Sequence, residues 1–300
     1  MMNEESSPLA AYAQLHLAVL LWGGTAILGD YIHLAAVPLV WWRVLLTSLL
    51  LLPLIRLGTF LRDIPTRQRW IFAGIGVIIA FHWVTFFGAI KLANASVGVV
   101  ALATTTFFSS FIEPWITGRR FVWGELALGL FILPGVYLIA ADIRPEMLPG
   151  LFVGLSSAVA VAVFTSLNKR YVTAADPLRI TFLEMGAATL VLTPFLPFAG
   201  GDFWPSTGDW GWLLLLAAVC TVFTNWLFLR VLRVLSAFAA NLTVNLEPVY
   251  GVALAYFLLD DGSELGPNFY WGAGMIIVAV FGYGAVRGTL RRRAGSRVQG

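Results

Sequence analysis

The sequence predicts an all-α integral membrane protein with ten transmembrane helices, arranged as two inverted-topology repeats of five helices. Three observations carry this prediction: a charge-poor composition, ten apolar stretches of membrane-spanning length, and features that recur 141 residues apart. Of the 300 residues, 59% are hydrophobic and 12% are charged. Soluble domains carry about twice that share of charge, so an ordinary soluble globule and a disordered chain are excluded.

The ten apolar stretches lie between polar, proline or glycine breaks. Each approaches the roughly 20 residues that an α-helix needs to cross a hydrocarbon layer. They are too long and too continuously apolar for barrel strands, which alternate over about ten residues. The first is not expected to be a cleaved signal, because no Lys or Arg precedes it. The stretches cover residues 11–29, 37–55, 70–90, 96–117, 122–141, 149–168, 178–198, 210–229, 236–258 and 269–286.

The distribution of Lys and Arg along these ten spans sets the expected orientation. Sixteen of these residues fall on the side that holds both termini, and only Lys91 and Arg144 fall on the opposite side. Basic loops mark the cytoplasmic side, so both termini are expected in the cytoplasm, with the bundle in a bacterial cytoplasmic (inner) membrane. The basic residues are scattered through short loops, so the expected partners are lipid and a small molecule and not a nucleic acid.

Recurring features in the two halves predict an internal duplication. A shift of 141 residues superposes Arg43 on Glu184 and Pro53 on Pro194. The second span of each half therefore carries one charge early and one proline near its end.

Because five is odd, the second half must enter the membrane from the opposite side. We place the first repeat at residues 1–145 and the second, with a basic C-terminal tail, at residues 146–300. Inverted repeats are a common transporter design, in which two similar halves open alternately around a site near the midplane.

Several short motifs add a family resemblance. The segments Leu-Trp-Gly-Gly at 21–24, Gly-Ala-Ile-Lys-Leu at 88–92 and Asn-Leu-Glu-Pro at 245–248 resemble the EamA branch of the drug/metabolite transporter superfamily. The resemblance implies a secondary transporter of amino acids or other small metabolites, often an exporter, as one member is for aromatic amino acids. The sequence departs from the family at 104–106, where three threonines stand in place of a common proline.

Two other functions stay open on the sequence alone. The transported solute could be a drug or a nucleotide-sugar-like molecule, although Arg43 is thin support for phosphate binding. A polytopic lipid-modifying enzyme would need a catalytic cluster, whereas His16, His33 and His82 are dispersed. No cofactor or metal motif occurs, so we expect a transporter that is not an enzyme and carries no cofactor.

Glu247 is the first of three ionisable residues inside apolar stretches, where charge is costly and usually functional. It lies about twelve residues into the ninth span, near mid-depth by the 1.5 Å rise per residue. Pro248 should free the carbonyl of Val244, which predicts a polar notch. We expect Glu247 to hold a substrate amine or a proton; the alternative is a kinked helix whose glutamate is satisfied by its neighbours.

Arg43 and Glu184 are the other two ionisable residues inside apolar stretches, and they lie in corresponding places of the two halves. For both, the functional interpretation is a pair of gates, with Glu184 also a candidate for proton coupling. Arg43 could instead anchor a carboxylate, because arginine donates a planar fork. For Arg43 the favoured interpretation is instead snorkelling to the nearby interface, which arginine does readily, or an ion pair.

Aromatic and polar residues complete the expected binding site, because aromatic walls suit an apolar or ammonium-bearing ligand. On the ninth span, Asn241 and Asn245 share one stripe and Glu247 and Tyr250 another, and we expect the Glu247 stripe to face the cavity. The remaining candidates are Trp22, Trp42, His82, Trp83, Phe86, Thr105, Phe108, Asn225, Asn245 and Tyr250.

Two pairs of glycines predict close helix crossings. Gly150 and Gly154 lie in the sixth span, and Gly284 and Gly288 at the end of the tenth. The second pair could mediate a homodimer, although packing within the chain is the favoured interpretation.

Overall fold

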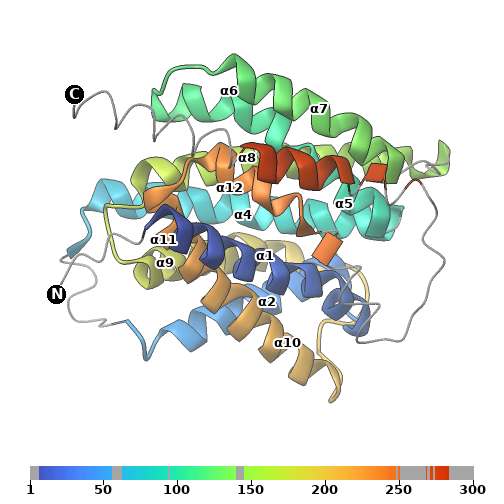
Figure 1. Cartoon of the computed structure of the whole chain (residues 1–300). Coiled ribbons are helices and arrows are strands. Elements are labelled where there is room, and N and C mark those ends of the chain that lie inside the picture. The colour runs from blue at the N-terminus through green and yellow to red at the C-terminus, as the bar shows by residue number, and fades with distance from the viewer. Residues whose placement is uncertain are drawn as a thin grey trace.

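The computed structural model describes residues 7–55, 63–93, 95–139, 145–247, 249–250, 268, 271–272 and 274–283. Over these residues the chain forms helices and no strand, which confirms the all-α prediction. The helices pack alongside one another in one bundle (Figure 1).

The helices follow one another with few residues between them. In the first part of the chain they are α1 (Pro8–Tyr31), α2 (Ala36–Leu51), α4 (Thr66–Leu92), α5 (Ala95–Ala103), α6 (Thr105–Thr117) and α7 (Trp123–Ile139). They continue with η1 (Pro145–Met147), α8 (Leu148–Tyr171), α9 (Pro177–Leu192), η2 (Thr193–Phe198), α10 (Asp209–Ala217), η3 (Ala218–Phe223), α11 (Thr224–Val234) and α12 (Ala237–Val244). Residues 274–283 are also helical.

Several of these helices are suited to a membrane. Four helical stretches in the described chain combine sufficient length with high hydropathy: Thr66–Leu92, Pro145–Tyr171, Pro177–Phe198 and Asp209–Val234. Three shorter apolar helices accompany them, at Ala36–Leu51, Trp123–Gly135 and Gly274–Tyr283. Where the structure describes them, all ten predicted stretches contain helix.

Two of the predicted spans are interrupted. The fourth breaks at Thr104, between α5 and α6, where the threonine hydroxyl donates to the carbonyl of Ala101 at 2.6 Å. Such side-chain bonds to the backbone compete with the helical ladder. In the ninth span, α12 ends at Val244 and Asn245 begins a turn. This end agrees with the carbonyl expected to be freed by Pro248, which itself lies outside the described residues.

Gly76 permits an unusually close approach between α4 and α9. A Cβ atom added at Gly76 would lie 2.1 Å from the carbonyl oxygen of Glu184, well inside van der Waals contact. By contrast, a Cβ atom added at Gly74 on the same helix would meet nothing within 4 Å. The backbones of α4 and α9 therefore touch at Gly76.

The predicted close crossing at Gly150 and Gly154 is also present. A Cβ atom at Gly150 would lie 2.7 Å from the Cβ atom of Ala93, and one at Gly154 would lie 2.6 Å from that of Ala101. Small residues let helix backbones approach in this way. The α8 helix therefore packs tightly against α4 and α5, whereas Gly284 and Gly288 lie outside the described residues.

A buried carboxylate holds the start of α12. Glu113, in the last turns of α6, is only 1% exposed. Its oxygens accept from the backbone amides of Ala237 and Phe238 at 2.9 and 2.7 Å. The Ser236 hydroxyl accepts from the amide of Ala239, the residue after Phe238, at 3.1 Å. The first amides of a helix have no partner within the helix and attract negative charge, so Glu113 acts as a cap from a distant part of the chain.

Arg119 extends this cap into a network that we call the Glu113 network, comprising Glu113, Arg119, Glu125 and Tyr283. The Arg119 guanidinium donates to Glu113 at 2.9 Å and to Glu125, and the Tyr283 hydroxyl donates to Glu125 at 2.9 Å. Burial lowers the pKa of Arg119, but the charges and hydrogen bonds of the two carboxylates outweigh that effect and raise it above its ordinary value. The network thus joins α6 and α7 to α12 and the helix at 274–283.

We predict that Gly76→Ala destabilises the protein and that Gly74→Ala does not. The added methyl at position 76 must push α4 away from the α9 backbone, which should cost about 3 kcal/mol or more. At position 74 the same change meets open space and gains helix propensity. Thermal unfolding in detergent should give Gly76→Ala a clearly lowered melting temperature and leave Gly74→Ala at or above wild type. Equal melting temperatures for the two variants would contradict the close approach.

We predict that Glu113→Gln also destabilises the fold, by about 3 kcal/mol. The amide keeps one acceptor, leaves one α12 amide unpaired and removes a negative charge from Arg119. Glu146→Gln, which changes an exposed glutamate, is the matched control and should melt like wild type. If Glu113→Gln melts with the control, the cap contributes nothing to stability.

Candidate functional site

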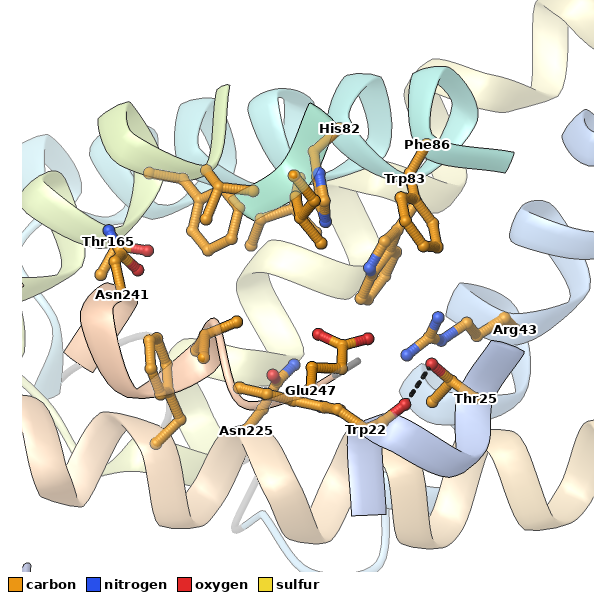
Figure 2. A pocket seen from close by; sticks show the side chains of 16 residues that line it. Trp22, Thr25, Arg43, His82, Trp83, Phe86, Thr165, Asn225, Asn241 and Glu247 are labelled. Carbon is orange, nitrogen blue, oxygen red and sulfur yellow. Dashed lines mark hydrogen bonds between the residues drawn. The ribbon is translucent and has the colours of Figure 1, made fainter. Parts of the chain in front are cut away.

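A cavity of about 90 Å³ lies inside the bundle, with side chains from α1, α2, α4, α5, α8, α11 and α12 on its walls. Figure 2 shows the side chains that line it. Seven of the sequence-predicted site residues are among them: Trp22, Arg43, His82, Trp83, Phe86, Asn225 and Glu247.

The volume of this cavity limits what it can hold. A water molecule needs about 10–15 Å³ measured in this way, so 90 Å³ has room for several waters. Pockets for small-molecule ligands span about 300–1,000 Å³. Binding a metabolite here therefore requires side chains or helices to move outward.

Arg43 points into the cavity and does not snorkel. Arg43 is 3% exposed, so the interpretation that it snorkels to the membrane interface is wrong. The guanidinium donates from Nε to the Thr221 hydroxyl at 2.9 Å and from a terminal nitrogen to the Cys220 carbonyl at 3.3 Å. Its Cζ atom also lies 4.1 Å from the centroid of the Trp83 ring, a cation–π contact.

The Cys220 carbonyl is available because η3 is a π-helical turn. In an α-helix the amide of Thr224 would donate to Cys220, but here it donates to the carbonyls of Val219 and Thr221. The freed carbonyl accepts from Arg43 and also from the Trp22 indole at 3.2 Å. Single π turns of this kind recur at functional sites.

Glu247 and Arg43 carry opposite charges within the same cavity. Figure 2 shows the two side chains directed toward one another beside the Trp83 ring. The pair attracts electrostatically, although no ion pair within 4.0 Å joins them in the described chain. The cavity therefore presents a guanidinium and a carboxyl group that are not in direct contact.

His82 supplies a further polar group to the wall. Its Nδ1 lies 2.7 Å from the Ser157 hydroxyl, which itself donates to the His82 carbonyl at 3.1 Å. A hydroxyl that donates to the carbonyl can accept only from a protonated Nδ1, and in the neutral imidazole of that tautomer Nε2 is an acceptor.

Five predicted site residues do not line the cavity, and each has its own contacts elsewhere. Trp42 donates to the Phe203 carbonyl, Thr105 to the Ala158 carbonyl and Asn245 to the Thr106 hydroxyl, while Tyr250 pairs with His16 and Phe108 packs against Phe107 and Phe111.

Glu184 also lies outside the lining. It is 2% exposed on α9, where its carboxylate hydrogen-bonds with Asn168 of α8. The structure thus separates it from Glu247, which was considered for the same proton-coupling role.

The lining also contains residues that were not predicted as site residues: Thr25, Ile79, Leu102, Val161, Phe164, Thr165, Phe228, Asn241 and Val244. Asn241 and Glu247 both reach the cavity although helical spacing assigns them to different stripes. The reason is that α12 ends at Val244, so the regular angle per residue does not extend to Glu247. The proline after Glu247 was the available signal for this change of direction.

Comparison with known proteins places the chain among transporters. The profile of the EamA-like transporter family matches twice, over residues 9–141 and again over residues 148–284. A relative described as an uncharacterized transporter, from Archaeoglobus fulgidus, is 24% identical over 220 residues, which cover 73% of this chain and 78% of that protein.

A solved crystal structure shares the fold. It superposes with a TM-score of 0.75 at 18% identity and covers 96% of this chain and 99% of its own. The two family matches together span most of the sequence, and the apolar helices make the chain an integral membrane protein. The chain therefore belongs to the EamA-like transporter family.

Proposed function

We propose that the chain is a secondary active transporter of small zwitterionic metabolites, with amino acids as the first class to test, and that it works as an exporter. In this proposal, two five-helix repeats of opposite orientation, 1–145 and 146–300, alternate the access of the cavity between the two faces. Both termini lie in the cytoplasm.

The observation that carries the proposal is the pairing of Arg43 and Glu247 in one buried, aromatic-walled cavity. Arginine binds carboxylates through a planar fork, and a carboxylate binds an ammonium group. A zwitterion of amino-acid type satisfies both charges at once. The rings of Trp22, Trp83 and Phe86 then suit an apolar side chain or an ammonium face.

Two features support alternating access. The same family profile matches each half separately, as a duplication requires. The Glu113 network joins helices of the first half to helices of the second at one end of the bundle. Access from that end would require this network to break or move, so we assign it the role of a barrier.

A nucleotide-sugar-like substrate is less well supported. Its diphosphate would require several cationic side chains, whereas Arg43 is the only Lys or Arg among the described residues that line the cavity. One arginine in the cavity is sufficient to bind a single carboxylate.

We predict that Glu247→Gln reduces uptake of amine-bearing substrates at least about tenfold, because a hydrogen bond to a charged group contributes about 1.5–3 kcal/mol. The measurement is uptake of each labelled amino acid by proteoliposomes, as a function of pH. Glu146→Gln, with its exposed side chain, should transport like wild type. An unchanged rate and pH profile in Glu247→Gln would remove Glu247 from the mechanism, and no flux of any amino acid would contradict the substrate class.

We predict that Arg43→Gln abolishes discrimination between an amino acid and its decarboxylated amine. Wild type should prefer the amino acid, and the variant should lose about tenfold or more of that preference because the guanidinium that binds the carboxylate is removed. Competition by the two compounds against labelled amino acid measures the ratio. The exposed Arg67→Gln variant is the matched control. A ratio that is unchanged in Arg43→Gln would exclude Arg43 as the carboxylate anchor.

A further inference from the structure

The Arg43 guanidinium is held by one of its two hydrogen-bonding forks and leaves the other free. In arginine, the Nε–H group and one N–H of Nη2 form a side fork, and the two terminal nitrogens form an end fork. The side fork of Arg43 is occupied, because Nε donates to the Thr221 hydroxyl at 2.9 Å and Nη2 to the Cys220 carbonyl at 3.3 Å. The end fork donates to no acceptor in the described chain, and Figure 2 shows the side chain directed into the cavity.

The Thr221 hydroxyl is oriented to accept from Arg43. Its single hydrogen is donated to the Leu216 carbonyl at 2.8 Å, and an arginine Nε never accepts. Leu216 precedes Thr221 by five residues, which is the spacing of a π turn. Three buried threonines in regular helices instead donate to the carbonyl four residues back: Thr47, Thr181 and Thr243. The π turn η3 therefore presents two acceptors to the same fork, the Thr221 hydroxyl and the Cys220 carbonyl.

Thr221 can act on a bound molecule only through Arg43. It is fully buried and is not among the residues that line the cavity. Removing its hydroxyl would leave the Nε–H of Arg43 without this acceptor inside the protein. An unpaired buried donor is costly, so the guanidinium would turn toward another acceptor and its end fork would change direction.

We propose that Thr221 is a positioning residue for the recognition of the substrate carboxylate. It fixes the Arg43 guanidinium so that the end fork faces the cavity. The inference rests on the proposed function, in which Arg43 binds the carboxylate of a zwitterion. Two parallel N–H groups match the two oxygens of a carboxylate, so the direction of the fork determines whether this contact is bidentate. A decarboxylated amine does not use the fork and should be indifferent to its direction.

Proteoliposome uptake of an amino acid and of its decarboxylated amine tests this role. Thr221→Val keeps the branched shape and removes the hydroxyl. We expect it to raise the KM for the amino acid at least about threefold, the equivalent of roughly half of one typical hydrogen bond to a charged group, and to leave the KM for the amine unchanged. The effect should be smaller than that of Arg43→Gln, because the Cys220 carbonyl still holds the guanidinium.

Two further variants control the uptake measurement. Thr221→Ser retains the hydroxyl and should restore the KM for the amino acid. Thr181→Val removes another buried hydroxyl, one that donates to the Pro177 carbonyl of its own helix, and should keep both wild-type KM values.

A double-mutant cycle tests the contact without any substrate. The melting temperatures of Thr221→Val, Arg43→Gln and the double variant are measured in detergent. Because both single changes remove the same hydrogen bond, the double variant should lose clearly less than the sum of the two single losses. Additive losses would exclude the contact between Arg43 and Thr221 and overturn the proposal.

The uptake results can also overturn the proposal. A Thr221→Val variant that changes neither KM, or raises both equally, would limit Thr221 to a role in its own helix, as would a Thr221→Ser variant that behaves like Thr221→Val. If Thr221→Val does not fold, Thr221→Ala replaces it in both measurements, since alanine favours helix more strongly. Absence of amino-acid uptake by wild type would overturn the proposed function and the carboxylate role with it, whereas coupled melting temperatures would still establish the contact, so the two failures are distinguishable.

Discussion

A buried guanidinium must have its donors satisfied, and much of the cavity is built around that requirement at Arg43. The π turn at Ala218–Phe223 skips one backbone bond and frees the Cys220 carbonyl. That single acceptor receives both Arg43 of α2 and Trp22 of α1. Three helices are thereby fixed relative to one another around a positive charge. The Arg43 guanidinium lies over the Trp83 ring and also lines the cavity.

The helix that carries the opposing charge is held from outside its own half. The start of α12 is capped by Glu113 of α6, and Glu113 is in turn neutralised by Arg119. The α12 helix is eight residues long and ends at Val244, three residues before Glu247. Because the helix is so short, its position is set by the cap at one end and by the polar contacts of Asn241 and Asn245 along its length. The location of Glu247 therefore depends on a contact made by the other half of the chain.

Sequence reasoning reached the helical class and the chemistry of the cavity for identifiable reasons. Charge at membrane depth is costly, which singled out Arg43 and Glu247, and the proline after Glu247 marked the place where α12 ends. It did not reach Thr165 or Phe164, because an apolar helix has no polar face to show which side turns inward. It also missed the role of the cap, since Glu113 and Ala237 are 124 residues apart. No feature of the local sequence predicts the π turn.

The glycine contacts of α4 have a mechanical consequence. Gly76 sets the α4 backbone against α9, and Gly150 sets α8 against the end of α4, with no side chain longer than a methyl group in between. Because the backbones are in direct contact there, no flexible side chains lie between them that could let the helices separate gradually. We expect this region to act as a fixed pivot. We then expect expansion of the cavity to occur at the facing wall, where α1 and α11 meet through the rings of Trp22 and Phe228.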